Sequence, residues 1–129
     1  MIIWIESYIL FYIPIGDYVF IFGGEVNTSD RGHEGAGDFA ADLISIHCSQ
    51  ASGYHLIPTQ PIADSTIPIA RGWTSMARLS DEMIEENENN TRNRSKRVVT
   101  SVLFGGLAGN DEEPIRLNDV WLLTISINV

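Results

Sequence analysis

Residues 18–24 read YVFIFGG and residues 100–106 read TSVLFGG, so a short apolar run ends twice in Phe-Gly-Gly. Each glycine pair is followed by a polar stretch, after which an aspartate, Asp42 or Asp119, opens a second apolar run. Glycine adopts positive φ readily and lets backbones approach closely, while β-branched and aromatic residues suit a buried, pleated sheet. A strand, a glycine pair, a loop and an aspartate-led strand that recur in one chain are typical of β-propeller blades. We therefore predict an all-β chain that contains two repeated units.

Both units resemble kelch repeats, whose blades have one strand that ends in paired glycines and a later strand with an aromatic residue. Residues 70–76, ARGWTSM, match the family's Arg-Gly-aromatic-Thr/Ser element, with Trp73 where the family usually has histidine. Trp121 matches the aromatic residue of the third strand, and Tyr54 stands where the fourth strand usually carries tryptophan. The first unit departs from the pattern at Ile44, where that third-strand aromatic residue is expected. The resemblance implies kelch-type β-propeller blades, each a four-stranded antiparallel sheet.

The expected strands divide the chain into a first blade over residues 1–58 and a second, incomplete blade over residues 59–129. In chain order, the strands are expected at residues 7–13, 18–22, 42–47, 54–57, 72–79, 98–104 and 119–127. Propellers close with about four to eight four-stranded blades. We therefore expect an incomplete ring: a fragment of a larger propeller, a truncated product, or a subunit that self-associates to complete a propeller.

Two insertions separate this chain from a compact repeat, and both are predicted to be flexible. Residues 80–97 begin acidic, turn basic and contain few apolar side chains, which indicates a mobile, solvated loop. The alternative is a docking or regulatory loop with Ser95 as a phosphorylation site.

The smaller insertion, residues 25–40, carries Glu25, Asp30 and His33. Carboxylates and imidazole are ligands for divalent ions, so these three residues could form a metal site. Three glycines in the same segment favour a flexible polar loop without a metal, and no cofactor is expected.

Composition limits the classes of partner. The chain has 129 residues, a formal net charge of −9 and a single cysteine, Cys48, which rules out an internal disulfide. Acidity of this degree disfavours nucleic acid, whose phosphates attract Lys and Arg. The apolar N-terminus lacks a basic start and is interrupted by Glu6, Pro14 and Gly16, so we predict strands there and no membrane segment. These observations favour a cytoplasmic protein.

The motifs assign no catalytic residue, and kelch propellers commonly act as scaffolds. The resemblance therefore implies a protein–protein interaction module, an inference that rests on fold-level analogy. Antiparallel connectivity predicts that residues 25–40, 59–69 and 107–118 emerge on one face and bind a protein or peptide, with residues 80–97 on the opposite face. The alternative is an enzyme or enzyme-associated kelch propeller with a metal site in residues 25–40.

Overall fold

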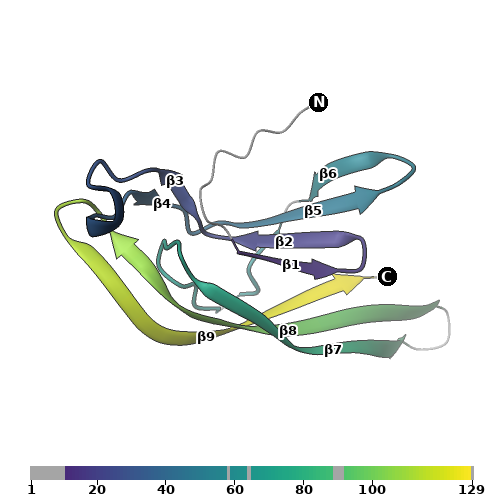
Figure 1. The fold of residues 1–129 in the computed structure, drawn as a ribbon. Coiled ribbons are helices and arrows are strands. Elements are labelled where there is room, and N and C mark those ends of the chain that lie inside the picture. The colour runs from purple at the N-terminus through teal and green to yellow at the C-terminus, as the bar shows by residue number, and fades with distance from the viewer. Residues whose placement is uncertain (1–10, 58, 64, 89–91, 129) are drawn as a thin grey trace.

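The structure, a computed structural model, describes residues 11–57, 59–63, 65–88 and 92–128. These residues form antiparallel β-sheets, which confirms the predicted all-β class (Figure 1). Nothing in the described ranges is a helix that is long and apolar enough to cross a membrane. The elements are β1 (Phe11–Ile15), β2 (Tyr18–Phe22), β3 (Glu25–Asn27), a 3₁₀ turn (Gly32–Glu34), β4 (Asp38–Phe39), β5 (Leu43–Ser49), β6 (Gly53–Ile57), β7 (Ser75–Glu88), β8 (Arg92–Gly109) and β9 (Pro114–Asn128).

The first sheet has the strand order β1-β2-β5-β6, and each neighbouring pair is antiparallel. Its strands lie where the sequence predicts the first blade, because apolar, β-branched runs are interrupted by turn residues. The turn between β1 and β2 uses Gly16 at a φ of 58°. Residues 7–10 of the first predicted strand lie outside the described residues.

The second sheet, β7-β8-β9, is longer than predicted. The prediction of a solvated loop over residues 80–97 is wrong, because β7 extends to Glu88, β8 begins at Arg92, and these two residues face each other in register. The change of sign along this segment brings the acidic half opposite the basic half in one hairpin. Asp81 accepts bonds of 2.8 and 2.7 Å from the Arg97 guanidinium, which lowers the pKa of Asp81. Opposite charges across paired strands stabilise a hairpin, although the composition alone indicates a loop.

The polar stretches that follow the glycine pairs are also more ordered than predicted. Residues 107–118 are mostly strand, since β8 continues to Gly109, β9 begins at Pro114, and only four residues connect them. Residues 25–40 contain β3 and β4, which pair with each other, and the 3₁₀ turn. Residues 59–63 and 65–69 form no helix or strand.

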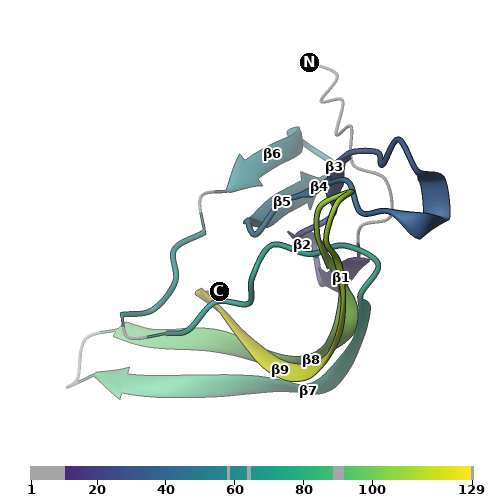
Figure 2. The ribbon, with the colours of Figure 1, turned by 90° about the vertical axis from the view of Figure 1, so that its left-hand side faces the viewer.

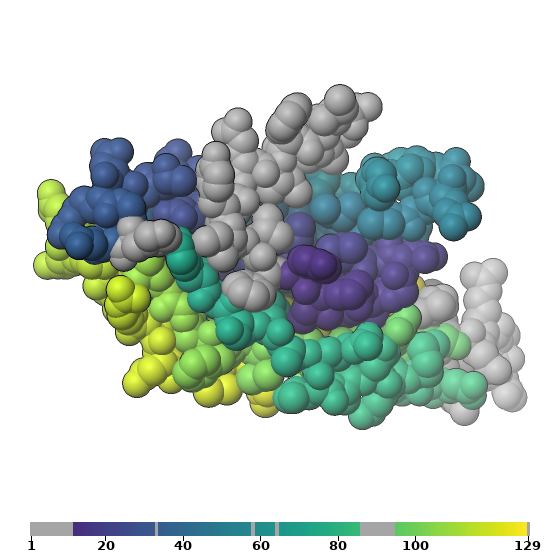
Figure 3. Space-filling model, viewed as in Figure 1, coloured from purple at the N-terminus to yellow at the C-terminus, as the bar shows by residue number. Residues whose placement is uncertain are grey.

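The two sheets face each other, and the main core lies between them (Figure 2). Ile13, Ile15 and Phe20 of the first sheet pack against Val99 and Ile125 of the second. The space-filling view shows β1 lying directly against β7 (Figure 3). The strands on the β6 and β9 side lie farther apart, and the segment after β6 crosses between them (Figure 2).

Candidate protein-binding surface

The two glycine pairs have matching backbone conformations. Gly23 and Gly24 have φ of 65° and 110°, and Gly105 and Gly106 have φ of 59° and 112°. All four values lie in the region that disfavours residues with a side chain. The repeat seen in the sequence therefore extends to the backbone. The strand contexts differ, because Gly23 and Gly24 directly follow β2, whereas Gly105 and Gly106 lie inside β8 at a register shift with β9.

The segment around Arg71 joins the two units at the glycine pairs. The Gly24 amide donates to the Arg71 carbonyl over 2.9 Å, and the Arg71 amide donates to the Ala40 carbonyl over 3.2 Å. The next residue, Gly72, exchanges two backbone bonds with Leu107 of the second unit. This backbone therefore pairs with both units, and it leaves no room at Gly23 for a side chain.

The side chain of Arg71 is buried and makes a bidentate ion pair. Its guanidinium donates to Asp119 over 2.7 and 2.9 Å and to the Gly105 carbonyl over 3.1 Å. The Trp121 indole donates to the same carboxylate over 2.6 Å. Arg71, and after it Trp121, lower the pKa of Asp119 to about 2. The Arg-Gly element and β9 thus form one structural junction. Asp119 lies inside β9 and does not open it as predicted, because β9 begins at Pro114.

The loops at this end of the molecule are tied to each other. Asp111, in the β8–β9 turn, accepts a hydrogen bond from the Ser29 hydroxyl and one of 3.0 Å from the Asp30 amide. The Arg31 guanidinium donates to the Asp111 carbonyl over 2.7 Å. The Ser29 hydrogen bond is the main cause of the lowered pKa of Asp111. Two loops whose contacts span 80 to 82 residues therefore form one surface, which we name the glycine-pair end.

The glycine-pair end combines acidic and apolar side chains. Trp73, which has a positive φ of 56°, is 40% exposed, and its indole donates to the Glu25 carboxylate over 3.4 Å. Val26 is also exposed. The exposed acidic residues of this end are Asp30, Glu34, Asp38, Glu112 and Glu113. Aromatic side chains that are partly exposed on a rigid frame are frequent anchors in protein interfaces.

The residues that the sequence offered as metal ligands differ in burial and in hydrogen-bond partners. Glu25 is buried and contacts Trp73, whereas Asp30 is exposed and joins Asp111 only through its backbone amide. The side chain of His33 lies outside the described part of the structure. Within the part that is described, no group of three or more His, Cys, Asp and Glu side chains is placed to hold a metal ion.

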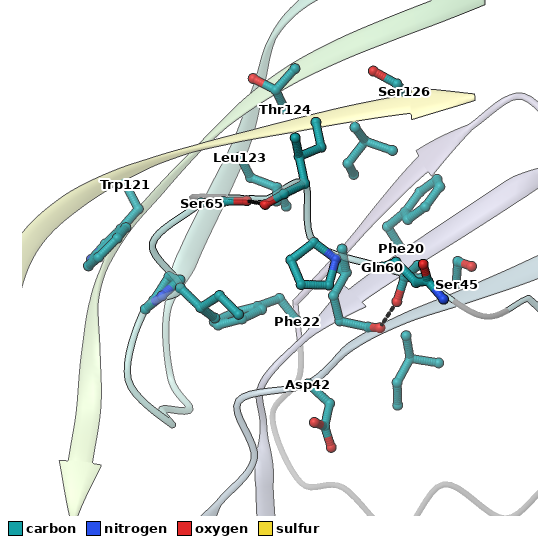
Figure 4. A pocket seen from close by; sticks show the side chains of 18 of the residues that line it. Phe20, Phe22, Asp42, Ser45, Gln60, Ser65, Trp121, Leu123, Thr124 and Ser126 are labelled. Atoms are coloured by element: carbon teal, nitrogen blue, oxygen red, sulfur yellow. Dashed lines mark hydrogen bonds between the residues drawn. The ribbon is translucent and has the colours of Figure 1, made fainter. Parts of the chain in front are cut away.

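Of the three segments predicted to share one face, residues 25–40 and the β8–β9 turn meet at the glycine-pair end. The third segment, residues 59–69, instead contributes residues 59–63 and 65–68 to the lining of a cavity of about 1140 Å³ between the two sheets. Phe20 and Ser45 of the first sheet lie on one side of this cavity, and Trp121 and Leu123 of β9 lie on the other (Figure 4). The Thr59 hydroxyl donates to the Leu43 carbonyl and fixes the segment to β5. The end of β7 and the beginning of β8 lie at the opposite end of the molecule, as predicted for residues 80–97 (Figure 1).

Sequence reasoning missed the roles of Arg71, Asp119 and Asp111. Arg71 belongs to a motif that the sequence singled out, but its partner Asp119 is 48 positions away. The recurrence of Asp42 and Asp119 could have suggested a special role, yet only Asp119 has an arginine partner among the described residues. Asp111 lies in an ordinary acidic turn, and no sequence signal separates it from Glu112.

Comparisons of the chain with protein-family models, with curated proteins and with solved structures find no match.

Proposed function

We propose that the chain is a kelch-type β-propeller unit that acts as a protein-binding scaffold in the cytoplasm. The glycine pairs with matching φ and the face-to-face packing of two antiparallel sheets support the propeller-type repeat. The proposed cytoplasmic location rests on Pro14 and Gly16, which interrupt the apolar stretch at residues 1–22.

The observation that carries the scaffold function is the tie between residues 29–31 and Asp111. It joins loops from both units into one ordered surface, since three hydrogen bonds hold them together. Loops held on a rigid sheet frame are frequent sites of recognition. The glycine-pair end therefore has the order that a specific binding surface needs.

The chemistry of the glycine-pair end favours a basic peptide segment as the partner. Its exposed carboxylates attract Lys and Arg, and Trp73 and Val26 offer apolar contact beside them. Opposite charges across an interface increase the association rate and exclude partners of the wrong charge. The net charge of −9 acts in the same direction at longer range.

An immobilised array of dodecapeptides with varied charge tests this function. We expect the wild-type chain to retain peptides rich in Lys and Arg, and the triple variant Asp30→Asn, Glu112→Gln, Glu113→Gln to lose about tenfold in affinity for them, about 1.4 kcal/mol. The backbone atoms of these residues make the described contacts, so neutral side chains preserve the loops.

A matched variant at the opposite end, Asp17→Asn, Glu82→Gln, Glu85→Gln, removes the same charge and controls for long-range attraction. The affinity of this control variant for the peptides should stay close to that of the wild type. The remaining difference between the two should shrink at higher salt, because salt screens distant charges. Equal losses in the two triple variants would contradict binding at the glycine-pair end. Absence of basic peptides from the retained set would contradict the assigned partner class.

A further inference from the structure

The outer face of the second sheet, which points away from the first sheet, carries exposed apolar side chains. Along β8 and β9, side chains alternate between the core and this face: Leu103 and Ile125 are buried, whereas Phe104 and Leu122 are 51% and 67% exposed. Phe104 lies opposite Val120, and Val102 lies opposite Leu122. We name as the front face the residues Ala77, Leu79, Val102, Phe104, Val120 and Leu122. Exposed apolar patches of this kind mark interaction sites.

The repeat identifies the counterpart of the front face in the first sheet, and there it is covered. Alignment of the two Phe-Gly-Gly runs makes Phe20 the counterpart of Val102 and Phe22 that of Phe104. Alignment of Asp42 with Asp119 makes Ser45 the counterpart of Leu122. Phe20, Phe22 and Ser45 are at most 5% exposed. Equivalent positions are therefore buried in the first unit, which has a sheet packed on it. In the second unit Val102 is partly exposed, and Phe104 and Leu122 are exposed.

The same alignment identifies a surface that could cover the front face. Inside the chain, the sheet surface that packs on Phe20 includes Leu123 and Ile125. Their counterparts in the first sheet are Ile46 and Cys48, which lie on the side of that sheet away from the core. We name as the back face the residues Tyr12, Val19, Ile44, Ile46, Cys48, Tyr54 and Leu56, which are partly to fully exposed. Ile21, which pairs with Tyr12 and Ile44 on the same side, is buried.

We propose that the front face of one copy of this chain binds the back face of a second copy. The front face and the back face are the counterparts of the two faces already joined inside the chain, so the same packing can repeat between copies. Such an interface joins different surfaces head to tail, and it leads to a ring where the rotation closes. The inference deepens the proposed function and rests on its propeller-type repeat, whereas peptide binding at the glycine-pair end does not depend on it.

The internal interface also predicts which residues meet between copies. Ile125 and Phe20 belong to one buried cluster. Their counterparts, Cys48 on the back face and Val102 on the front face, should therefore lie opposite each other across the new interface. Facing sheets are about 10 Å apart, which is within reach of a short bismaleimide that links two thiols.

The test uses the full chain with Val102→Cys, treated with the bismaleimide at several protein concentrations. We expect covalent dimers and larger products that disappear in the double variant Val102→Cys, Cys48→Ser. The variant Thr28→Cys places a thiol on an exposed residue of the glycine-pair end and should give no more than background dimer. Val120→Cys, on the same front face, provides a second thiol if Val102→Cys unfolds in a urea titration.

Three outcomes decide the proposal. Loss of the products on Cys48→Ser supports head-to-tail binding of the two faces. Products that persist without Cys48 would mean that two front faces meet, which overturns it. Absence of products from both front-face variants overturns it too. The peptide array, repeated with the folded front-face variant, reports separately on the proposed function, because the front face and the glycine-pair end are different surfaces.

Discussion

Replacing Asp119 with alanine is expected to lower the free energy of unfolding by about 3 kcal/mol. The substitution leaves the buried Arg71 guanidinium without the carboxylate that accepts two of its hydrogen bonds. Breaking a buried ion pair by removing one partner costs about 3 to 5 kcal/mol, and the lower value applies because the Asp119 side chain is 38% exposed. A urea titration of the wild type and the variant measures the difference.

Asp42→Ala is the matched control, since Asp42 holds the equivalent position in the first repeat and its exposed side chain makes no ion pair within the described ranges. Its cost should stay within about 0.5 kcal/mol. Acid provides a second check, because the pKa of Asp119 in the folded chain, about 2, lies below its ordinary value of 3.8. The stabilisation is therefore present above about pH 4 and is lost as the pH falls toward about 2.

The difference in stability between the wild type and Asp119→Ala should shrink over that acid range. Equal costs for the two aspartate substitutions, or a difference that does not change with pH, would contradict the assigned role of the ion pair. Either result would mean that Arg71 is held by its bonds to backbone carbonyls instead.

Replacing Gly23 with alanine should also cost about 3 kcal/mol of unfolding free energy. Its φ of 65° is left-handed, which costs a residue with a side chain about 1 kcal/mol. The added Cβ would overlap the Arg71 carbonyl oxygen and approach the Ala40 carbonyl oxygen to 3.3 Å. Both atoms belong to the backbone, so relief requires the segment that joins the two units to move, at about 2 kcal/mol.

Gly32→Ala separates the two contributions, because Gly32 has a similar φ of 60° but nothing lies within 4 Å of an added Cβ. It should cost only about 1 kcal/mol in the same urea titration. If the two alanine variants were equally stable, the close approach of the Arg71 backbone to Gly23 would be disproved.

The sequence predicted the first sheet well and the second sheet less well, for a physical reason. In β2 and β5, apolar β-branched and aromatic residues define the strands, and these are local properties that a single sequence displays. In residues 80–97 the side chains are polar, and the strands depend on pairing such as that of Asp81 with Arg97 across the hairpin. Amino-acid composition carries no information on which residues pair across a hairpin, so composition alone predicts a loop for residues 80–97.

The candidate surface was predicted in part. Loop positions after the glycine pairs followed from antiparallel connectivity, and two of the three segments do meet at one end of the molecule. The bonds that order this surface join Ser29 and Arg31 to Asp111 over separations of 82 and 80 residues. Contacts between distant polar side chains depend on the packing of the two sheets, which one sequence does not specify.

The central claim is that the two sheets are copies of one repeat whose free faces bind a further copy of the chain. Light scattering on the purified chain over a range of concentrations tests it most directly. We expect a particle mass of at least twice 14.3 kDa, which rises with concentration until it reaches a constant multiple of the chain mass. A mass of 14.3 kDa at every concentration, with a single cooperative unfolding transition, would contradict it.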